Sequence, residues 1–440
     1  MLITMRFYDR KEELELLKSS RLQSRKTSCF TLMIGRRRIG KTSLLLESVK
    51  GCKSLYFFVT RQSEALLAYS FQQEATRQLG VNFMGTASSF ADVFEMLMKY
   101  SEQEPFTLII DEFQELNNVN PAIFGDIRNI WDKNKDKSRI NLIACGSIYS
   151  MMIRIFEGRQ EPLFARQTSK LVLNPFSVAT LKDILGDYNR KYTSEDLLCL
   201  YLLTGGVAKY VSVLMDSAAV TWRKMLRRVI SPDSPFLTEG RDILVSEFGK
   251  DYGIYFSVLQ LIASGKNTQP EIDSIIGKNT GAYLYNLENE YMLVRRVRPI
   301  FAKPGSRNSR WSISDNFLRF WFRYVYPNQL LIEQGRFDLL REIVEKDYEQ
   351  YSGRVLEMYF RDKIAQQERM TNIGAFWDRK GVNEIDLVAI SDLDKKAIIA
   401  EVKRNPRKLN AETLTSKSEV LKPNLDGYKI EYRLLSMEDM

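Results

Sequence analysis

A glycine-rich segment near the N-terminus sets the strongest limit on how this chain can fold. Gly35-Arg-Arg-Arg-Ile-Gly40-Lys41-Thr42 matches the pattern G-x-x-x-x-G-K-[ST], follows the apolar run Phe30–Ile34 and opens a helical stretch, Thr42–Val49. In such a loop the glycines let backbone N–H groups converge on phosphate oxygens, and the following helix adds the positive end of its dipole. A strand, a phosphate-binding loop and a helix in this order predict an α/β domain that binds a nucleoside triphosphate.

The first 180 residues repeat this alternation of strand and helix. Short, uninterrupted apolar runs are expected for strands that are buried on both faces of a parallel sheet. Amphipathic helical stretches such as Ser63–Leu79 and Ser89–Tyr100 separate the runs. The predicted fold class is therefore α/β, with a doubly wound parallel sheet. The predicted strands are Phe30–Ile34, Leu55–Val59, Thr107–Ile110, Ile140–Ala144 and Leu171–Leu173.

The loop and the acids after the third apolar run together predict a nucleotide site. Lys41 is placed to contact the β- and γ-phosphates, and the Thr42 hydroxyl is placed to bind Mg²⁺. Asp111 and Glu112 end the run Thr107–Ile110, so Asp111 would complete the Mg²⁺ shell and Glu112 would polarise the attacking water. The predicted ATP-binding residues are Gly35, Arg36, Arg37, Arg38, Ile39, Gly40, Lys41, Thr42, Ser43 and Asp111.

Two further side chains are candidates for catalysis in this domain. Ser147 follows the strand Ile140–Ala144, where its hydroxyl would contact the γ-phosphate or the water, and plain turn chemistry is the alternative. Arg166 lies just before the last predicted strand. It is a candidate arginine finger or γ-phosphate sensor, and a solvated loop arginine is the alternative.

The composition removes several classes of chemistry. The 440 residues contain no histidine, which excludes His-activated nucleophiles, His general bases and His-ligated zinc. The four cysteines form no Cys-x-x-Cys pair, so we expect no disulfide framework and a cytoplasmic location. No stretch approaches the ~18 apolar residues of a membrane span, so no membrane partner is expected. The net charge of +9 suits a polyanionic partner without singling out nucleic acid.

Beyond Pro175 the pattern becomes mainly helical. We predict an ATPase domain over 1–178, a helical lid over 179–240, a third domain over 241–326 and a fourth over 327–440. The third domain shows three short helices and two strands joined by a basic loop, which is the arrangement of a winged helix. The loop carries Lys303, Arg307 and Arg310, and both DNA contact and a packing role between the neighbouring domains are open.

The fourth domain carries acids in a pattern that suits metal-dependent chemistry. Asp386 and the pair Glu401-Val-Lys403 lie on apolar strands, and residues two apart share one face of a strand. With Glu357 on a preceding helix, they form the PD-(D/E)xK nuclease pattern. Glu357, Asp386 and Glu401 would hold Mg²⁺, and Lys403 would orient the attacking water or stabilise the developing charge. Acids that merely alternate on a solvated strand are the alternative.

These motifs resemble an archaeal and bacterial AAA+-type ATPase family of the signal-transduction (STAND) NTPase group. The resemblance covers nearly the whole chain. Its lid motif, Gly-Gly-x-Pro, resembles Gly205-Gly206-Val-Ala208, in which alanine replaces the proline and an interhelical turn is the alternative reading. The other matching segments are Phe7-Tyr-Asp-Arg10-Lys-Glu-Glu13, the glycine-rich loop, Leu-Ile-Ile-Asp111-Glu112-Phe-Gln, Cys145-Gly-Ser147 and Asp315-Asn-Phe317-Leu-Arg319-Phe-Trp321.

The resemblance implies a P-loop NTPase sheet with a helical lid, a winged-helix domain and a small α/β domain of the PD-(D/E)xK type. It implies a Mg²⁺-dependent ATPase whose nucleotide state gates a DNA nuclease-like domain. The alternative is a nucleotide switch or DNA-binding regulator in which that domain is a non-catalytic scaffold. ATP is the expected ligand and DNA the expected partner, and assembly into a homo-oligomer is open.

Overall fold

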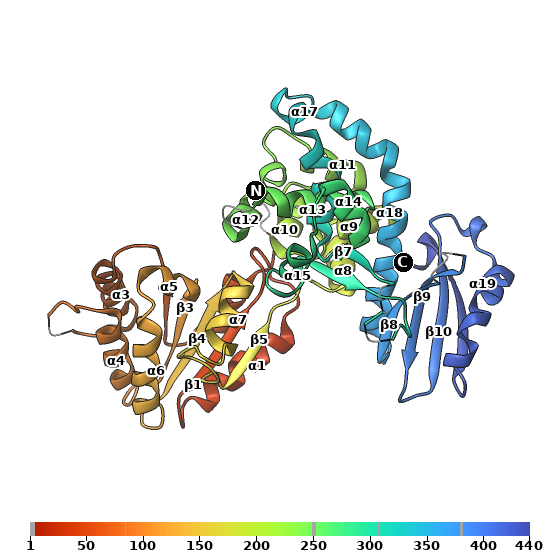
Figure 1. Cartoon of the computed structure of the whole chain (residues 1–440). Coiled ribbons are helices and arrows are strands. Elements are labelled where there is room, and N and C mark those ends of the chain that lie inside the picture. The colour runs from red at the N-terminus through yellow and green to blue at the C-terminus, as the bar shows by residue number, and fades with distance from the viewer. Residues whose placement is uncertain (1–4, 84, 249–251, 304, 307, 379–381) are drawn as a thin grey trace. The chain divides into compact units, whose positions relative to one another are not determined.

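The computed structural model describes residues 5–83, 85–248, 252–303, 305–306, 308–378 and 382–440. The chain divides into two compact units (Figure 1). The first unit is Phe7–Asn174, and the second is Pro175–Met440 together with the residues that precede Phe7. The division lies close to the boundary predicted at residue 178, and the boundaries at 240 and 326 remain predictions within the second unit.

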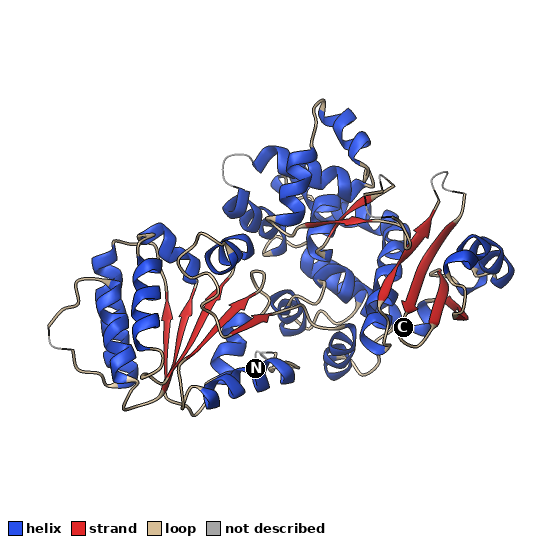
Figure 2. Ribbon diagram, turned by 60° about the horizontal axis from the view of Figure 1, so that its bottom comes forward, coloured by secondary structure: helices blue, strands red, loops and turns tan. Residues whose placement is uncertain are grey.

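The first unit is built on a five-stranded parallel sheet with the order β2-β3-β4-β1-β5. All five predicted strands are present, which confirms the α/β class. Helices cover both faces of the sheet (Figure 2), and the three central strands are therefore buried along their whole length. The strands are β1 (Cys29–Ile34), β2 (Ser54–Phe58), β3 (Phe106–Asp111), β4 (Ile140–Gly146) and β5 (Ser169–Val172).

Aromatic packing fixes the helices on one face of this sheet. The ring of Phe71 stacks between those of Phe57 and Phe90, with centroids 4.4 and 5.0 Å away. Phe30 on β1 packs against Trp131 at 5.1 Å, and such offset or tilted pairs add to the energy of burial. The α-helices of this unit, on both faces of the sheet, are α1 (Lys11–Gln23), α2 (Lys41–Ser48), α3 (Glu64–Leu79), α4 (Phe90–Tyr100), α5 (Leu116–Val119), α6 (Ile123–Asn134) and α7 (Tyr149–Glu157).

The second unit begins with helices that pack around α9 (Ser194–Thr204). Every α9 residue from Asp196 to Thr204 is buried, as expected for a helix that is apolar on all sides. The other helices of this part are α8 (Val178–Tyr188), α10 (Ala208–Asp216), α11 (Trp222–Val229) and α12 (Phe236–Phe248).

The predicted three helices and two strands follow. They are α13 (Tyr252–Ser264), α14 (Gln269–Ile276), α15 (Gly281–Asn289) and the antiparallel pair β6 (Val294–Val297) and β7 (Arg310–Ile313). The next helices are α16 (Asn316–Phe320) and α17 (Gln329–Glu333), with a π-helical stretch between them. The aromatic residues Phe317, Phe320, Trp321 and Phe322 are 0–1% exposed, so they belong to the core of this unit.

The chain ends in a long helix and a mixed four-stranded sheet with the order β11-β10-β9-β8. Strands β9 and β10 were predicted from the sequence, whereas β8 and β11 were not. The outer strands are only partly buried: β8 has two buried residues, Ala375 and Trp377, and β11 has none, so they lack the continuous apolar run that marks the central pair. The elements are α18 (Phe337–Gln367), β8 (Asn372–Trp377), β9 (Glu384–Ser391), β10 (Lys396–Val402), α19 (Ala411–Ser418) and β11 (Lys429–Leu435).

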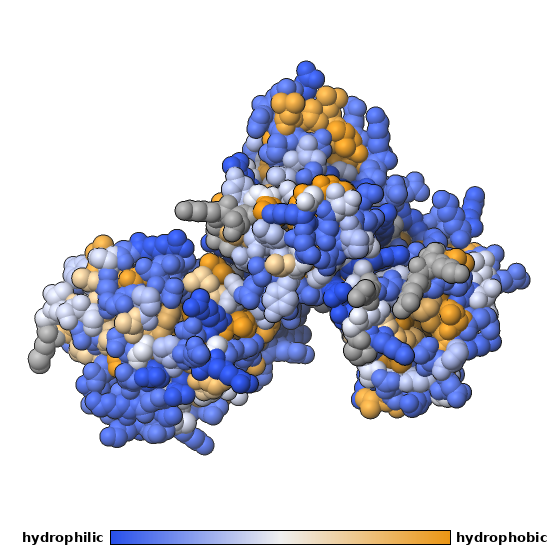
Figure 3. All heavy atoms as spheres, in the orientation of Figure 1, coloured by the Kyte–Doolittle hydropathy of each residue, from blue (hydrophilic) through white to orange (hydrophobic). Residues whose placement is uncertain are grey.

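Most of the surface visible in Figure 3 is hydrophilic, in keeping with the 27% of charged residues. Apolar side chains gather over α17 and the start of α18, at the top of that view. Leu330 is 64% exposed, and Leu339 and Ile343 are about 40% exposed. Apolar surface of this kind often marks contact with another molecule.

Gly205 and Gly206 form the turn between α9 and α10, which agrees with the interhelical-turn reading. Their φ angles are 54° and 78°, in the left-handed region. A β-carbon on Gly206 would lie 2.4 Å from the carbonyl oxygen of Phe176. Glycine is therefore required at residue 206 for both backbone conformation and space.

Replacing Gly206 with alanine is expected to lower the free energy of unfolding by about 3 kcal/mol or more. The cause is that the added methyl group meets backbone, which cannot rotate away. Thermal denaturation followed by circular dichroism measures the change. Gly186→Ala in α8 is the matched control, because its β-carbon would meet nothing closer than 3.7 Å. Equal melting temperatures for the two variants would contradict this account.

Candidate functional site

The loop between β1 and α2 encloses its own lysine. Lys41 is 7% exposed, and its ammonium group donates to the carbonyl oxygens of Gly35 at 2.7 Å and Arg36 at 3.0 Å. Burial lowers the pKa of Lys41 below its ordinary value. The ammonium group is thus held at the start of α2, where phosphate oxygens can replace the two carbonyl groups as acceptors.

The backbone of this loop explains its glycines. Gly40 precedes α2 with φ 99°, and a β-carbon on Gly35 would lie 2.9 Å from the carbonyl oxygen of Leu173. Ile39 is buried and anchors the loop. The remaining predicted ATP-binding side chains on this loop and first helical turn are accessible: Arg36 is half-buried, and Arg37, Arg38, Thr42 and Ser43 are exposed.

The carboxyl end of β3 brings Asp111 to the first turn of α2. The Thr42 hydroxyl donates to Asp111 Oδ2 at 3.0 Å, and the Tyr56 hydroxyl donates to the same oxygen at 2.7 Å. Burial, together with Asp111, raises the pKa of Tyr56 well above its usual range, so the phenol stays a neutral donor. The oxygens of Thr42 and Asp111 fit Mg²⁺, which prefers oxygen ligands and takes few of them from the protein.

Glu112 is held by two neutral side chains at the ends of β3 and β4. Its Oε2 accepts hydrogen bonds from the Ser147 hydroxyl at 2.7 Å and from the Gln114 amide. Gln114 is fully buried, and its Oε1 has no hydrogen-bond partner among the residues that the structure describes. Ser147 thus positions the carboxylate of Glu112. Sequence reasoning missed Gln114 and Tyr56, and the only signal for Gln114 was an amide two residues after the acids.

The structure places Arg166 outside this site, which corrects the γ-phosphate-sensor role, whereas an arginine finger supplied to another copy of the chain stays a prediction. Ile34, which leads into the phosphate-binding loop, pairs with Val172 at the end of β5, whereas Arg166 precedes β5 at the opposite edge of the sheet. Its guanidinium group donates to Asp132 at 3.1 Å, near the end of α6. The sequence correctly placed Arg166 just before the first residue of β5. In a parallel sheet, however, the first residues of the strands lie at the edge away from the phosphate-binding loop.

Replacing Glu112 with glutamine is expected to slow ATP hydrolysis by about 10²–10³-fold, because the base that polarises the water is lost. ATP affinity should change by less than about threefold, since Glu112 holds no phosphate contact in this arrangement. Phosphate release and calorimetry measure the two quantities. Glu115→Gln is the control, because Glu115 pairs with Arg61 instead. Equal turnover in the two variants would remove Glu112 from this role.

A second group of predicted residues meets on β9 and β10. Lys403 Nζ lies 3.0 Å from Asp386 Oδ2 and 3.4 Å from Glu401 Oε1. The antiparallel register, in which Ala400 pairs with Leu387, brings the two acids side by side. Glu401 is 9% exposed, and its Oε2 has no hydrogen-bond partner in the described part of the chain. A buried carboxylate oxygen of this kind fits a hard divalent cation.

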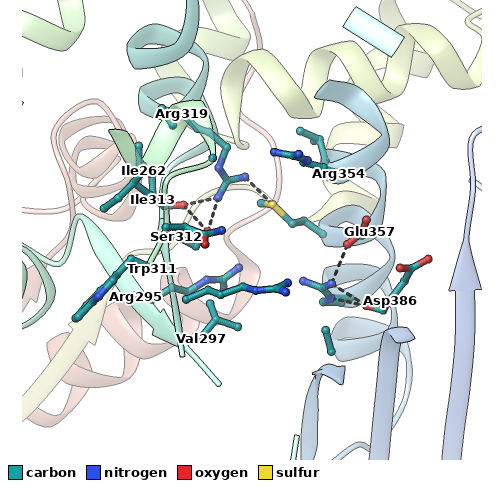
Figure 4. Close-up of a pocket in the computed structure, with 18 of the residues that line it drawn as sticks. Ile262, Arg295, Val297, Trp311, Ser312, Ile313, Arg319, Arg354, Glu357 and Asp386 are labelled. Atoms are coloured by element: carbon teal, nitrogen blue, oxygen red, sulfur yellow. Dashed lines mark hydrogen bonds and ion pairs between the residues drawn. The ribbon is translucent and has the colours of Figure 1, made fainter. Parts of the chain in front are cut away.

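Glu357 does not join these residues, which corrects its predicted role as a metal ligand. It accepts a hydrogen bond from Arg361 at 3.1 Å, and Arg361 also donates to the carbonyl oxygen of Asp386 at 2.7 Å (Figure 4). Burial and the charge of Asp386 raise the pKa of Glu357 to about 7. Across the described ranges, no three or more Cys, Asp or Glu side chains are grouped closely enough to hold a metal ion. Asp386 and Glu401 remain as candidates.

The β6–β7 hairpin packs against the C-terminal sheet of the same unit. Arg310 pairs with Glu384 at 2.7 Å and lies over the ring of Trp377 at 4.5 Å. The backbone N–H of Ile300 donates to the carbonyl oxygen of Ala375 at 2.8 Å. Arg310 is therefore engaged in packing, Lys303 is exposed, and Arg307 lies outside the described residues.

Comparison with known proteins identifies the chain. Residues 7–214 match a family described as an ATPase domain predominantly from Archaea, and residues 321–414 match a family of archaeal and bacterial proteins of unknown function. An uncharacterized protein of Methanocaldococcus jannaschii is 30% identical over an alignment of 447 residues. The alignment covers 98% of this chain and 95% of that protein. The chain belongs to the same family as that protein, with an archaeal-type ATPase domain over residues 7–214. The resemblance stated from the motifs is thereby confirmed for the ATPase part.

Two solved structures share the fold of this archaeal ATPase. The Walker-type ATPase PABY2304 of Pyrococcus abyssi aligns with a TM-score of 0.57 and 18% identity, over 73% of this chain and 99% of that one. The ORC2 protein of Aeropyrum pernix, in its ADPNP-ADP complexes, aligns with a TM-score of 0.53 and 16% identity, over 76% and 96%. These two structures show a P-loop fold, and the match of residues 7–214 to the ATPase family shows that the chain is an ATP-binding ATPase. In the described residues, no helix combines the length and apolar character needed to cross a membrane.

Proposed function

We propose that this archaeal ATPase binds ATP with Mg²⁺ and that its nucleotide state gates a DNA-cleaving site in the second unit. The contact between Thr42 and Asp111 at 3.0 Å, beside the buried ammonium group of Lys41, supports the first half of the proposal. The placement of Asp386, Glu401 and Lys403 on neighbouring strands supports the second half.

In the ATPase site each side chain has a separate task. Lys41 leaves the carbonyl groups of the loop and contacts the β- and γ-phosphates. Thr42 and Asp111 hold Mg²⁺, which when bound neutralises the charge of the phosphates. Glu112, held by Ser147 and Gln114, accepts a hydrogen bond from the attacking water and orients it toward the γ-phosphate.

In the second unit the chemistry rests on the unpaired oxygen of Glu401. Asp386 and Glu401 would hold a divalent ion, which when bound supplies an activated water and offsets charge on a phosphodiester. Lys403 lies within hydrogen-bond distance of both acids and would orient the water or stabilise the developing charge. No histidine is needed for this chemistry.

A nucleotide switch with a non-catalytic C-terminal scaffold is the second candidate. It is favoured by Lys403, which pairs with both acids, and by Lys417, which lies 3.9 Å from Glu401, because two cations offset the two negative charges without a metal. This alternative predicts nucleotide-dependent assembly and no DNA cleavage with any metal ion.

DNA as the partner is supported by the elements α13, α14, α15 and the β6–β7 hairpin, which follow one another as in a winged helix. On β6 and just after it, Arg295, Arg296 and Arg298 are exposed. Glu288 on α15 and Glu290 just after it oppose phosphate contact, so β6 offers a better basic surface than the helix does.

The experiment that tests the proposal is a set of cleavage assays on single- and double-stranded DNA. Mg²⁺, Mn²⁺ and EDTA are each combined with ATP, with ADP and with no nucleotide. The proposal predicts metal-dependent cleavage whose rate depends on the nucleotide. Absence of cleavage in every combination, together with assembly that follows the nucleotide, would replace it with the switch.

A further inference from the structure

A cavity of about 430 Å³ lies within the second unit, between the β6–β7 hairpin and α18 (Figure 4). This volume lies in the range of ligand-binding pockets. Its wall includes the acids Glu357, Glu384 and Asp386 and the arginines Arg295, Arg310, Arg319, Arg323, Arg354 and Arg361. The cavity therefore adjoins the Asp386 cluster and carries more positive than negative side chains.

Each of the three acids already has a cationic partner. Arg310 pairs with Glu384 at 2.7 Å, and Arg361 pairs with Glu357 at 3.1 Å. Lys403, whose ammonium group lies 3.0 Å from Asp386, pairs with the third acid.

Arg323 is neutralised from outside the cavity, since it pairs with Asp347 at 2.6 Å. The remaining arginines, Arg295, Arg319 and Arg354, have no ion pair with a carboxylate group within 4.0 Å among the described residues. The excess positive charge of the cavity is thus located on these three side chains.

The three arginines come from different elements and meet around one space. Arg295 on β6 and Arg354 on α18 are exposed, and Figure 4 draws both in the wall of the cavity. Among the described residues, Arg319 on α16 donates to neutral acceptors only: the side chain of Asn316 at 3.1 Å, the Ser312 hydroxyl at 3.2 Å, the carbonyl oxygen of Ile313 and the sulfur of Met358 at 2.6 Å. Burial lowers the pKa of Arg319 below its ordinary value, as expected for a cation that is poorly solvated.

Three guanidinium groups without matching acids repel one another, and an anion with several oxygens would relieve that repulsion. Guanidinium groups bind phosphate oxygens through two parallel hydrogen bonds, which gives both affinity and orientation. The cavity is too small for a duplex but suits a nucleotide of one strand. A phosphate group bound here would lie beside the acids proposed to cleave phosphodiesters.

We propose that this cavity binds phosphate groups of a single nucleic acid strand and presents the strand to the Asp386 cluster. The assignment of nucleic acid rests on the proposed function, whereas the binding itself requires neither ATP nor cleavage. A free nucleotide offers the same phosphate chemistry, so the test separates the two sources.

The test is a fluorescence anisotropy titration of the full-length chain with a labelled oligothymidylate, in EDTA and without ATP, between 50 and 200 mM salt. Arg295→Gln and Arg354→Gln are each expected to weaken binding roughly five- to tenfold. Each is also expected to reduce the slope of log affinity against log salt by about 0.7, the value for one phosphate contact on a single strand. Unlabelled oligothymidylate should displace the probe at a far lower nucleotide concentration than thymidine monophosphate.

Arg227→Gln is the matched control, because Arg227 is exposed on α11 and does not line the cavity. Affinities of the two cavity variants equal to that of the control would overturn the proposal. Equal displacement by the monophosphate would also overturn it and make the cavity a nucleotide site. Melting temperature and ATP turnover verify that the variants are folded.

The two proposals fail separately. If Asp386→Ala abolishes cleavage while the arginine variants bind normally, the cleavage site stands and the cavity does not. If no metal ion supports cleavage but the arginine variants lose affinity, the cavity stands as a binding site and the nuclease proposal is wrong.

Discussion

Replacing Lys41 with alanine is expected to lower the affinity for ATP by at least about a hundredfold, or roughly 3 kcal/mol. The ammonium group is already at the start of α2, where Gly35 and Arg36 accept its hydrogen bonds. Exchanging two neutral acceptors for anionic phosphate oxygens adds the attraction between opposite charges to these hydrogen bonds. The variant loses this interaction. Isothermal calorimetry with ATP and Mg²⁺ measures the change.

Lys50→Ala is the control for this experiment. Lys50 lies beyond the other end of α2, is exposed and pairs with Glu47, so its loss removes the same charge without touching the loop. Its ATP affinity should stay within about twofold of the native value. Native ATP affinity in Lys41→Ala would mean that this loop does not hold the triphosphate.

Replacing Asp386 or Lys403 with alanine is expected to reduce DNA cleavage by about 10³-fold or more, which corresponds to roughly 4 kcal/mol in the barrier. Loss of Asp386 removes one of two carboxylate groups proposed to hold the metal. Loss of Lys403 leaves Asp386 and Glu401 without the cation that lies between them. Plasmid nicking in the presence of Mg²⁺ measures both effects.

Controls for this pair must separate chemistry from folding. Asp426→Ala removes an exposed acid from the same sheet domain and should leave cleavage unchanged. Lys403→Arg keeps the positive charge beside both acids, so it should preserve stability while cleaving more slowly than the native chain. Undiminished cleavage in Asp386→Ala and Lys403→Ala would place the active site elsewhere.

The central parallel strands could be predicted because each is a continuous apolar run that ends at a recognisable residue. The Gly35–Thr42 segment and the Asp111-Glu112 pair mark the ends of β1 and β3, and both ends lie at the same edge of a parallel sheet. The contact between Thr42 and Asp111 follows from that topology. In the same way, residues two apart on an extended chain share a face, which placed Lys403, the residue after β10, beside Glu401.

Other features depend on packing that the sequence pattern does not contain. Arg166 was adjacent to a predicted strand, but its pairing with Asp132, 34 residues away in sequence, is not contained in the local pattern. Glu357 lies on the predicted helix, yet its pairing with Arg361, one turn later, removes it from the acids on the strands. The cavity combines Arg295 and Arg354 from elements almost sixty residues apart, and no local pattern reveals such a meeting.

The most direct test of the account is the rate of DNA cleavage by Glu112→Gln with Mg²⁺ and saturating ATP, ADP or no nucleotide. This variant should hold ATP without turning it over, so one nucleotide state persists throughout the assay. The account predicts cleavage rates that differ by about tenfold or more between ATP and ADP, the difference expected for a coupling of roughly 1–3 kcal/mol. Lys41→Ala should show no such dependence. Measurable cleavage at the same rate under all three conditions would contradict the coupling of the two sites.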